Sequence, residues 1–329
     1  MRQLASLASL VALVTLAGLA SAGTPLTFRK AKEIPLPGAT GFDLLSIEPA
    51  SRRLLVAHGT KIEVIDVDKG EKIGAVEGLD GAHMAVLVPE LKRGFATEGK
   101  KKMLAVFDAE TFRVTKEVDT GEGPDALLYV TTTKEVWVMN HKAGTITCVD
   151  ATSLEVKATI DVGGKLELAA EYVAKGLVFV NVEDKSHVAS IDAKTHAVLA
   201  RYALDPAAEP TGIAIDEKNG LLFCGCAEKL AIVDAASGKV LSTLPIGAHC
   251  DSVAFDAEKG LVFASCGDGT ATAVREVDAK TFEVAVKFDT AAGGRTCALD
   301  PKSHALWIAA GTRGKDDVRV LGYVADAAK

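Results

Sequence analysis

Acidic and histidine side chains recur at one position of a sequence pattern that repeats about every 42 residues. Each of them stands just before a short apolar run, as His83 does before residues 85–88. The set contains four carboxylates, one imidazole, one hydroxyl and one guanidinium, on Asp43, His83, Asp125, Glu167, Thr211, Asp251 and Arg295. Carboxylate oxygens with one or two imidazole nitrogens suit Ca²⁺, Mg²⁺ or a transition metal. The set predicts a divalent-cation site or a site for a polar ligand, provided that the fold brings it together.

A second set of polar residues falls about half a repeat later, where short loops are expected. It comprises His58, Glu98, His141, Asn181, Glu183, Asp268 and Arg313. We expect both sets to face the same end of the fold and to form one ligand-binding surface. The competing interpretation is structural, because carboxylates at a wet rim also cap exposed N–H groups and bind water. No H-E-x-x-H motif is present, so the sequence leaves both interpretations open.

The sequence offers little support for nucleophilic catalysis. No G-x-S-x-G motif is present, so the sequence shows no nucleophile elbow. A metal-assisted lactonase, hydrolase or lyase with His83 or His141 as general base stays open, since such sites are recognised by geometry. No C-x-x-C-H motif occurs, which excludes covalently attached c-type haem at the level of motifs. The cofactor is left unassigned, with a divalent cation as the candidate.

Six cysteines raise the question of disulfides in a chain that we expect to be exported. Cys226, Cys250 and Cys266 fall within two adjacent repeats, on the side expected to bind ligand. The expected bridge joins Cys250 to either Cys226 or Cys266. A metal site formed by Cys224 and Cys226 with His249 is the alternative.

The elements that must position these residues repeat along the chain. An apolar or β-rich pair followed by aspartate recurs at Asp66, Asp108, Asp150, Asp192, Asp234 and Asp278. Successive aspartates are 42, 42, 42, 42 and 44 residues apart. Each of them begins a polar turn, so we expect their carboxylates to bond the backbone two residues further on rather than to bind a ligand.

Each repeat contains four short runs that are rich in β-branched and aromatic residues. In the third repeat these runs are 126–130, 136–140, 145–150 and 156–162. Short runs of this kind separated by polar turns are typical of an antiparallel meander. A period of 40 to 45 residues with four strands indicates the blade of a β-propeller. We therefore predict an all-β fold, a seven-bladed β-propeller with four-stranded antiparallel blades.

The seventh repeat ends before its fourth strand. It supplies three β-rich runs, 296–299, 305–310 and 318–324, whereas residues 26–36 form a further run ahead of the first repeat. We predict that this N-terminal strand completes the last blade and closes the ring, which removes exposed sheet edges. Residues 23–329 then form a single domain.

The repeats resemble the YVTN/YncE-like family of β-propeller repeat proteins. The resemblance is carried by the passages between a fourth strand and the next first strand, such as 119–126 and 160–163, and by the Val-Asp or Ile-Asp endings followed by Ala and Thr or Ser. It covers about residues 26–326 and implies a seven-bladed propeller, often secreted or periplasmic, in a family of diverse roles. Related propellers include lactonases, haem-carrying nitrite reductase domains and surface-layer proteins. The Gly-His and Trp-Asp markers of WD40 proteins are not found here at repeat spacing.

Residues 1–22 are predicted to be a signal peptide, with a positive start at Arg2, an apolar stretch over 4–19 and a small-residue cleavage site at 20–22. We therefore expect a periplasmic or secreted protein with no membrane span after cleavage. A formal net charge of −7 disfavours nucleic acid as a partner. The sequence favours a monomeric scaffold that binds a small-molecule or protein ligand at its loop-rich face and is not an enzyme. A metal-assisted lactonase, hydrolase or lyase is the alternative.

Overall fold

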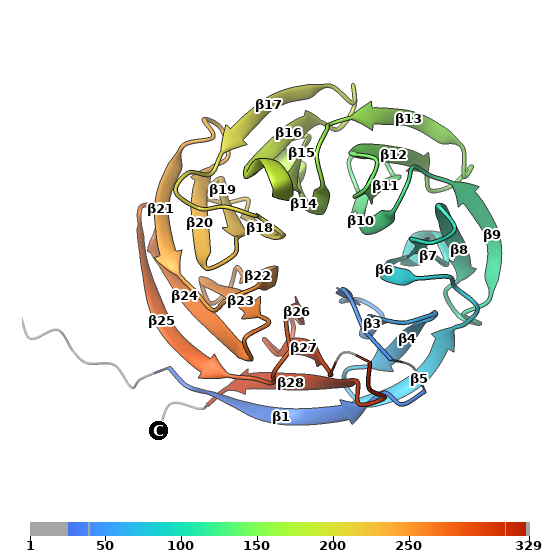
Figure 1. Cartoon of the computed structure of the whole chain (residues 1–329), viewed down its shortest axis with the longest axis horizontal. Helices are drawn as coiled ribbons and strands as arrows, with labels where there is room; N and C mark the ends of the chain where they lie inside the picture. The colour runs from blue at the N-terminus through green and yellow to red at the C-terminus, as the bar shows by residue number, and fades with distance from the viewer. Residues whose placement is uncertain (1–25, 39, 313, 327–329) are drawn as a thin grey trace, which may run out of the picture.

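A ring of seven four-stranded antiparallel sheets makes up the molecule (Figure 1). The computed structural model describes residues 26–326 with the exception of residues 39 and 313, so the predicted signal peptide lies outside the described residues. Within the described part, helix is confined to three 3₁₀ turns, η1 (Pro89–Leu91), η2 (Val173–Lys175) and η3 (Glu183–Lys185). The predicted all-β, seven-bladed propeller is confirmed.

Each blade begins at its innermost strand and proceeds outward along the chain. The first three blades are β2–β5 (Leu45–Glu48, Arg53–His58, Lys61–Asp66, Glu71–Val76), β6–β9 (Ala82–Val88, Arg93–Glu98, Met103–Asp108, Val114–Asp119) and β10–β13 (Pro124–Val130, Glu135–Asn140, Thr145–Asp150, Val156–Asp161). The next three are β14–β17 (Leu166–Tyr172, Leu177–Val182, His187–Asp192, Val198–Ala203), β18–β21 (Gly212–Asp216, Leu221–Gly225, Lys229–Asp234, Val240–Pro245) and β22–β25 (Cys250–Asp256, Leu261–Cys266, Thr270–Asp278, Thr281–Asp289). The seventh combines β26 (Thr296–Leu299), β27 (Leu306–Ala310), β28 (Arg319–Ala325) and β1 (Phe28–Pro35).

The repeating aspartates have the structural role predicted for them. Asp108 ends β8, and its Oδ1 accepts hydrogen bonds from the backbone N–H groups of Glu110 and Thr111 at 3.0 and 2.7 Å. These bonds lower the pKa of Asp108, because they stabilise the charged carboxylate. The equivalent aspartates make the same kind of bond, at Asp66, Asp150, Asp192, Asp234 and Asp278. Each turn between a third and a fourth strand is therefore fixed locally.

The hydrophobic core lies between neighbouring blades. One large buried aromatic side chain projects from the second strand of each blade after the first, on Phe95, Trp137, Phe179, Phe223, Phe263 and Trp307. Such a side chain removes roughly 150–250 Å² from water. The core clusters combine residues of adjacent sheets, as where Phe263 of β23 and Ile308 of β27 belong to one cluster. Each blade therefore depends on both neighbours for the burial of its two faces.

Hydrogen bonds also join each blade to the next at every one of the seven blade junctions among the described residues, from the first or second strand of one blade or from a residue beside it to the next inner strand or its entrance. In each case a polar side chain contacts a backbone carbonyl oxygen of the following blade. The contacts are Ser46 to Ala85 (2.5 Å), Thr97 to Asp125 (2.8 Å), His141 to Leu166 (3.2 Å), Asn181 to Gly212 (2.9 Å), Thr211 to Cys250, Ser265 to Gly294 (2.9 Å) and Thr296 to Asp43 (2.9 Å). Leaving a buried partner unsatisfied costs roughly 1–3 kcal/mol, so these bonds fix the position of each inner strand relative to the next.

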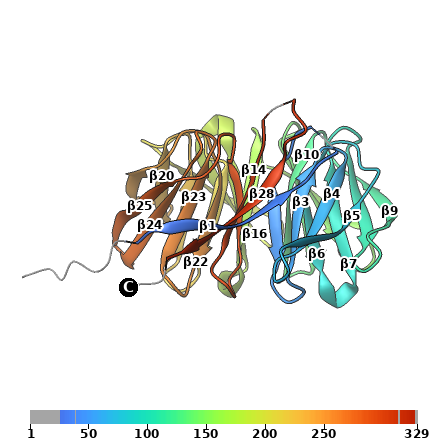
Figure 2. The ribbon, with the colours of Figure 1, turned by 90° about the horizontal axis from the view of Figure 1, so that it is seen from below.

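The N-terminal strand closes the ring, as predicted. β1 pairs antiparallel with β28 on the outer edge of the seventh blade, and the pairing runs from Phe28–Ala325 to Pro35–Arg319. Figures 1 and 2 show the two strands side by side from both directions. Beyond the strand, the N–H of Leu36 donates to the carbonyl of Val318 at 2.8 Å. Ile34 and Leu36 are buried in a cluster that spans the first and last blades.

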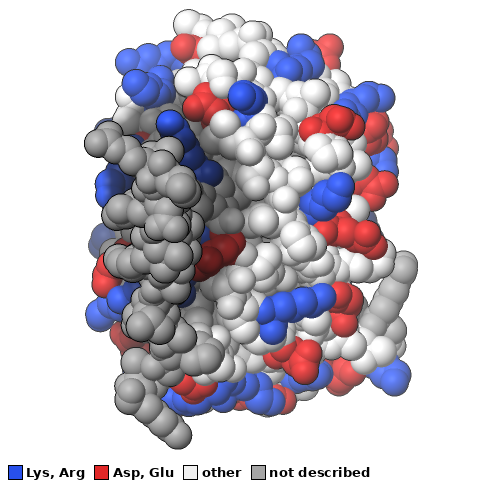
Figure 3. All heavy atoms as spheres, turned by 90° about the vertical axis from the view of Figure 1, so that its left-hand side faces the viewer, with Lys and Arg blue, Asp and Glu red and all other residues white. Residues whose placement is uncertain are grey.

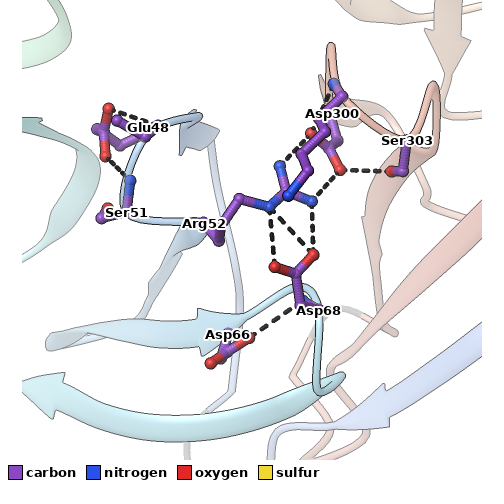
Figure 4. A network of polar contacts seen from close by, with 9 residues as sticks. Glu48, Ser51, Arg52, Asp66, Asp68, Asp300 and Ser303 are labelled. Atoms are coloured by element: carbon purple, nitrogen blue, oxygen red, sulfur yellow. Dashed lines mark hydrogen bonds and ion pairs between the residues drawn. The ribbon is translucent and has the colours of Figure 1, made fainter.

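An ion-pair network adds a second connection between the first and seventh blades (Figure 4). Arg52, in the turn between β2 and β3, donates to both carboxylate oxygens of Asp300 at 2.5 Å. It also reaches Asp68 at 2.9 Å. Burial opposes ionisation of Asp300, but the hydrogen bonds from Arg52, Ser303 and the backbone of Lys302 outweigh it and hold its pKa at about 2. A fork of two parallel bonds of this type is among the stronger polar contacts.

Deletion of residues 23–37 is expected to destabilise the protein or drive it to oligomerise, because it removes β1 and exposes the edge of β28. Loss of the buried side chains of Ile34 and Leu36 alone is worth roughly 2–5 kcal/mol each. Light scattering after size exclusion and thermal unfolding measure the effect. A deletion of residues 23–25, which spares the strand, is the control. A monomer of unchanged stability after the longer deletion would contradict ring closure by β1.

Asp300→Asn is expected to lower the free energy of unfolding at neutral pH by about 2 kcal/mol, in proportion to the depressed pKa. A depressed carboxyl pKa contributes stability above the unfolded value near 4, and the contribution is lost as pH falls through about 2. The difference between variant and wild type should therefore vanish at pH 2. Urea unfolding at both pH values tests this. Asp68→Asn, which alters the exposed partner of Arg52, should have a much smaller effect, and an equal effect would refute the assignment.

Candidate functional site

The entrances of the seven inner strands bring the first set of predicted residues together. We call Asp43, His83, Asp125, Glu167, Thr211, Asp251 and Arg295 the channel-mouth ring. Four of its members lie in stretches where the register between first and second strand shifts, namely His83, Asp125, Glu167 and Asp251. The other three lie one or two residues before an inner strand. A β-bulge turns a side chain out of the ladder, so the four residues at register shifts leave the regular pairing of their own sheets.

Acid–histidine contacts connect neighbouring members of the ring. His83 Nδ1 lies 2.6 Å from Asp43 Oδ2 and 3.1 Å from Asp125 Oδ1. One loop further round, His141 Nδ1 lies 2.9 Å from Glu167 Oε1. The structure groups the possible ligand atoms into two triads that share Asp125, in each of which all ligand atoms lie within 4.8 Å of one another. Five side chains from blades one to four thus form one continuous cluster.

Arg295 occupies the next part of the ring. Its Nε donates to Asp251, and its Nη2 lies 3.6 Å from Asp43 Oδ1. The guanidinium stacks over the ring of Phe42, with 5.3 Å between its carbon and the ring centroid. Sequence patterns gave no indication of Phe42, because a single aromatic before an inner strand does not recur in the other repeats.

The pKa values of the cluster reflect crowding of negative charge. Burial raises the pKa of Asp125 to about 7, and the neighbouring carboxylate of Asp43 adds to the effect. Burial also raises the pKa values of Glu167 and Asp251, the latter against the opposing charge of Arg295. The hydrogen bond to Asp43 raises the pKa of His83, as the bond to Glu167 does for His141. The cluster therefore retains protons that isolated side chains would release near neutral pH.

A pocket of about 450 Å³ opens over the cluster. It is lined by Asp43, His83, Gly99, Lys100, Gly123, Asp125, His141 and Lys142. A Cβ at position 99 would lie 2.5 Å from Nε2 of His83, so the imidazole requires glycine there. Two further pockets adjoin Arg295, with volumes of about 540 and 200 Å³. The mouth is thus hollowed on both sides of the ring.

Three residues of the second predicted set are not at the pocket surface. His58 and Glu98 are the last residues of β3 and β7, and both are buried. His58 contacts the buried carboxylate of Glu63 at 3.1 Å, while Glu98 accepts a hydrogen bond from the backbone N–H of Asp80. Asn181 is buried and donates across a blade junction. A residue that is still paired in the β-ladder points into the space between two sheets. The positions of His58, Glu98 and Asn181 therefore do not fit the prediction that these residues contact a ligand.

His141 behaves differently because it follows the end of β11 by one residue and leaves the ladder. Its side chain reaches the pocket and the fourth blade. Glu183, also from the second set, lines the smaller pocket beside Arg295. Asp268 instead accepts hydrogen bonds from the backbone N–H of Thr270 in its own turn and from that of Ala248 in the loop before β22. The predicted residue Arg313 lies outside the described residues.

All six cysteines are buried and free in the structure. Cys250 lies directly opposite Cys266 in the register of β22 and β23, whereas Cys226 belongs to the preceding blade. A bridge between Cys250 and Cys266 stays a prediction. None of the groups of metal-ligating atoms in the described residues includes Cys224, Cys226 or His249. Burial raises the pKa of Cys226 to about 12, which disfavours the thiolate form that binds metals.

A third group of ligand atoms lies at the opposite end of the blades. It consists of Glu135, Cys148 and His196. Glu135 Oε2 already accepts hydrogen bonds from Trp137 Nε1 and His196 Nε2, both at 2.9 Å. Cys148 is fully buried, and burial raises its pKa. No sequence pattern predicted this cluster. Its polar contacts join the third blade to the fourth, which indicates a structural role.

The circumference of the molecule shows no comparable concentration of charge where it is visible. On the side of the ring displayed in Figure 3, Lys and Arg side chains are interspersed with Asp and Glu. Single large apolar residues are exposed on the outer strands, among them Ile73, Val156 and Leu199. Among residues 26–326, excluding 39 and 313, no helix has the length and apolar character needed to span a bilayer.

Comparisons with known proteins identify the fold and no closer relationship. The sequence matches no protein-family model, and no curated protein matches it. By structure, 1719 chains of solved structures match. One of them, from a crystal structure of a mitotic checkpoint complex, superposes with a TM-score of 0.77 over 98% of both chains at 13% sequence identity. At that identity the similarity shows the propeller fold alone.

Asp125→Asn is expected to flatten the pH dependence of stability. The pKa values of Asp125, His83 and His141 are all raised in the folded state. Groups of this kind contribute stability below their unfolded pKa values, near 4 for Asp and 6.5 for His, and the contribution is lost as pH rises through the folded values. The free energy of unfolding should therefore fall between pH 5 and 8, by roughly 1–3 kcal/mol.

Urea unfolding of wild type and Asp125→Asn at pH 5, 6.5 and 8 measures this decline. The variant should be the more stable protein at pH 8, since it removes a crowded carboxylate. Glu155→Gln, in an exposed turn at the opposite end of the blades, is the matched control. A wild-type stability that rises with pH over this interval would contradict the assignment of raised pKa values.

Proposed function

We propose that this chain is an exported ligand-binding propeller of the YVTN/YncE-like kind, and that its channel-mouth ring binds a small, positively charged ligand. The observation that carries the proposal is an excess of carboxylates in one mouth. Asp43, Asp125, Glu167 and Asp251 all belong to the ring, whereas Arg295 neutralises part of the charge at Asp251 and Asp43. Export rests on the predicted signal peptide at residues 1–22.

A cationic ligand would relieve the electrostatic cost of this arrangement. Burial opposes ionisation of Asp125, Glu167 and Asp251, as their raised pKa values record. A positive charge placed among them would favour the ionised forms. The folded scaffold supplies the carboxylates in fixed positions, which reduces the cost of ordering them upon binding.

The shape of the mouth favours a small ligand. Its pocket of about 450 Å³ falls in the range of roughly 300–1,000 Å³ that holds small molecules in proteins. Lys100 and Lys142 also line this pocket, and their side chains are exposed to solvent. They would disfavour cations that extend far outside the pocket, and the site therefore suits a compact ligand.

Spermidine serves as the test ligand. We expect it to bind the wild-type protein at low ionic strength, measured by isothermal titration calorimetry at pH 7.5. The double variant Asp125→Asn/Glu167→Gln should raise the Kd at least about tenfold, which corresponds to 1.4 kcal/mol. Citrate, an anion of similar size, should not compete.

The matched control is Glu155→Gln/Glu258→Gln, which neutralises two exposed carboxylates away from the mouth. It should leave the Kd unchanged, although the net charge of the protein changes equally. Binding that weakens equally in both double variants would show a non-specific charge effect and sink the proposal. Preference for citrate over spermidine would do the same.

One observation favours the hydrolase or lyase as a second candidate. A carboxyl with a pKa of about 7 is suited to act as a general base at neutral pH. Asp125 also lies in an open pocket beside His83 and His141, where a water molecule could be held. A screen of γ- and δ-lactones by acid release tests it, with Asp125→Asn as the variant that must lose any activity found.

A further inference from the structure

Five acidic and histidine side chains meet at the channel mouth. Binding of an organic cation would require the carboxylates but not the histidines. Asp43, His83 and Asp125 form one triad of ligand atoms, and Asp125, His141 and Glu167 form the other. Carboxylates alone would attract an ammonium group. Two imidazoles on either side of one shared carboxylate add nitrogen ligands, which bind transition-metal ions.

Within the two triads, the contacts are hydrogen-bonded pairs whose spacing equals, or is a few tenths of an ångström shorter than, that of ligands around a metal ion. His83 Nδ1 lies 2.6 Å from Asp43 and 3.1 Å from Asp125, and His141 Nδ1 lies 2.9 Å from Glu167. Neighbouring ligands of a four- to six-coordinate ion with bonds near 2.1 Å are separated by about 3.0–3.4 Å. Small side-chain rotations would therefore convert hydrogen-bonded pairs into a ligand set.

The backbone holds these side chains from four different blades. His83, Asp125 and Glu167 project from bulged entrances of β6, β10 and β14. Asp43 precedes β2, and its carbonyl accepts the hydrogen bond of Thr296 across the ring closure. His141 Nδ1 lies 3.2 Å from the carbonyl oxygen of Leu166 and beside Glu167, so the other ring nitrogen, Nε2, is the one that would bind a metal ion. The ligand atoms thus depend on the closed ring and not on one flexible loop.

Charge and access also fit a metal ion. With both imidazoles neutral, Asp43, Asp125 and Glu167 carry three negative charges, which a divalent ion would largely neutralise. The pocket above them leaves space for water or a substrate at the remaining coordination positions. The mixture of imidazole and carboxylate suits Zn²⁺, Mn²⁺ or Co²⁺ better than Ca²⁺, which prefers oxygen ligands throughout.

We propose that the channel mouth binds one divalent transition-metal ion at Asp125, which both triads share, with either Asp43 and His83 or His141 and Glu167 as the other protein ligands. This inference rests on the proposed function, because it names the class of cation that the same mouth binds. Asp125 is the ligand shared by both halves of the cluster, so its loss should affect the site more than the loss of Asp43 or Glu167.

The experiment uses tag-free full-length protein, stripped with a chelator and titrated with Zn²⁺, Mn²⁺ and Co²⁺. Calorimetry gives affinity and stoichiometry, and the visible absorption of Co²⁺ reports directly on ligation by nitrogen. We expect one ion per chain. Because even residues that merely support metal ligands are worth about 10–100-fold in affinity, Asp125→Asn and at least one of His83→Gln and His141→Gln should raise the Kd at least about tenfold, and an unchanged Kd in both histidine variants would overturn the proposal.

His304→Gln is the matched control. His304 Nδ1 lies 2.7 Å from Asp256 Oδ2, so this acid–histidine pair resembles those of the mouth. It belongs to no group of three ligand atoms among the described residues. Its substitution should leave metal affinity unchanged, and circular dichroism confirms that each variant folds.

Two outcomes separate this inference from the proposed function. If spermidine binds and Zn²⁺ displaces it, with both lost in Asp125→Asn, both proposals are supported. If spermidine binds in the manner expected but no metal binds, or metal binding is unaffected by Asp125→Asn, the metal site is refuted and the cation-binding mouth stands. If neither binds, both proposals fail.

Discussion

The hydrogen bonds between neighbouring blades are the constraint on which the rest of the molecule depends. At each of the seven junctions, a polar side chain contacts the backbone at or just before the inner strand of the following blade, from Ser46 to Thr296. These contacts and the buried aromatics of the second strands set the angle between blades. Because the candidate site is assembled from four blades, its geometry exists only while the whole ring is closed.

Aspartate serves two opposite purposes in this protein, and its surroundings distinguish them. Asp108 and its equivalents receive backbone N–H groups, which lower their pKa values and keep them ionised. Asp125 is instead crowded by burial and by Asp43, and its pKa rises to about 7. Strongly raised values of this kind gather at functional sites more often than at structural turns. The contrast within one repeated sequence favours the mouth as the working surface.

The regular period carried most of the information about fold. The spacing of the aspartates from Asp66 to Asp278 gave six repeats, and the incomplete seventh repeat settled the blade count and led to β1 as the closing strand. The position of each residue within the repeat also located the channel-mouth ring, because residues at or just before the start of an inner strand lie at the mouth. Export and family membership stay predictions, since neither the described residues nor the comparisons bear on them.

The prediction for the second set of polar residues was less accurate than that for the channel-mouth ring, because an error of one residue changes the direction in which a side chain points. Glu98 and Asn140 are equivalent positions, 42 residues apart, and both are buried at the ends of their strands. His141 is one residue beyond this phase, outside the ladder, and reaches the mouth. Strict use of the 42-residue period would have assigned His141 and Glu98 to different positions of the repeat. The bulges at His83 and Asp125 have no such sequence signal, since they depend on tertiary packing around the channel.

The central claim is that the closed ring is one cooperative unit that positions the mouth. Hydrogen exchange measured by mass spectrometry on wild type and Thr296→Val tests it most directly, because Thr296 bonds Asp43 across the junction of the seventh and first blades. The account predicts faster exchange in the inner strands of all seven blades, including β10 and β14 on the far side of the ring. Faster exchange confined to β26 and β2, with the other blades unchanged, would contradict it.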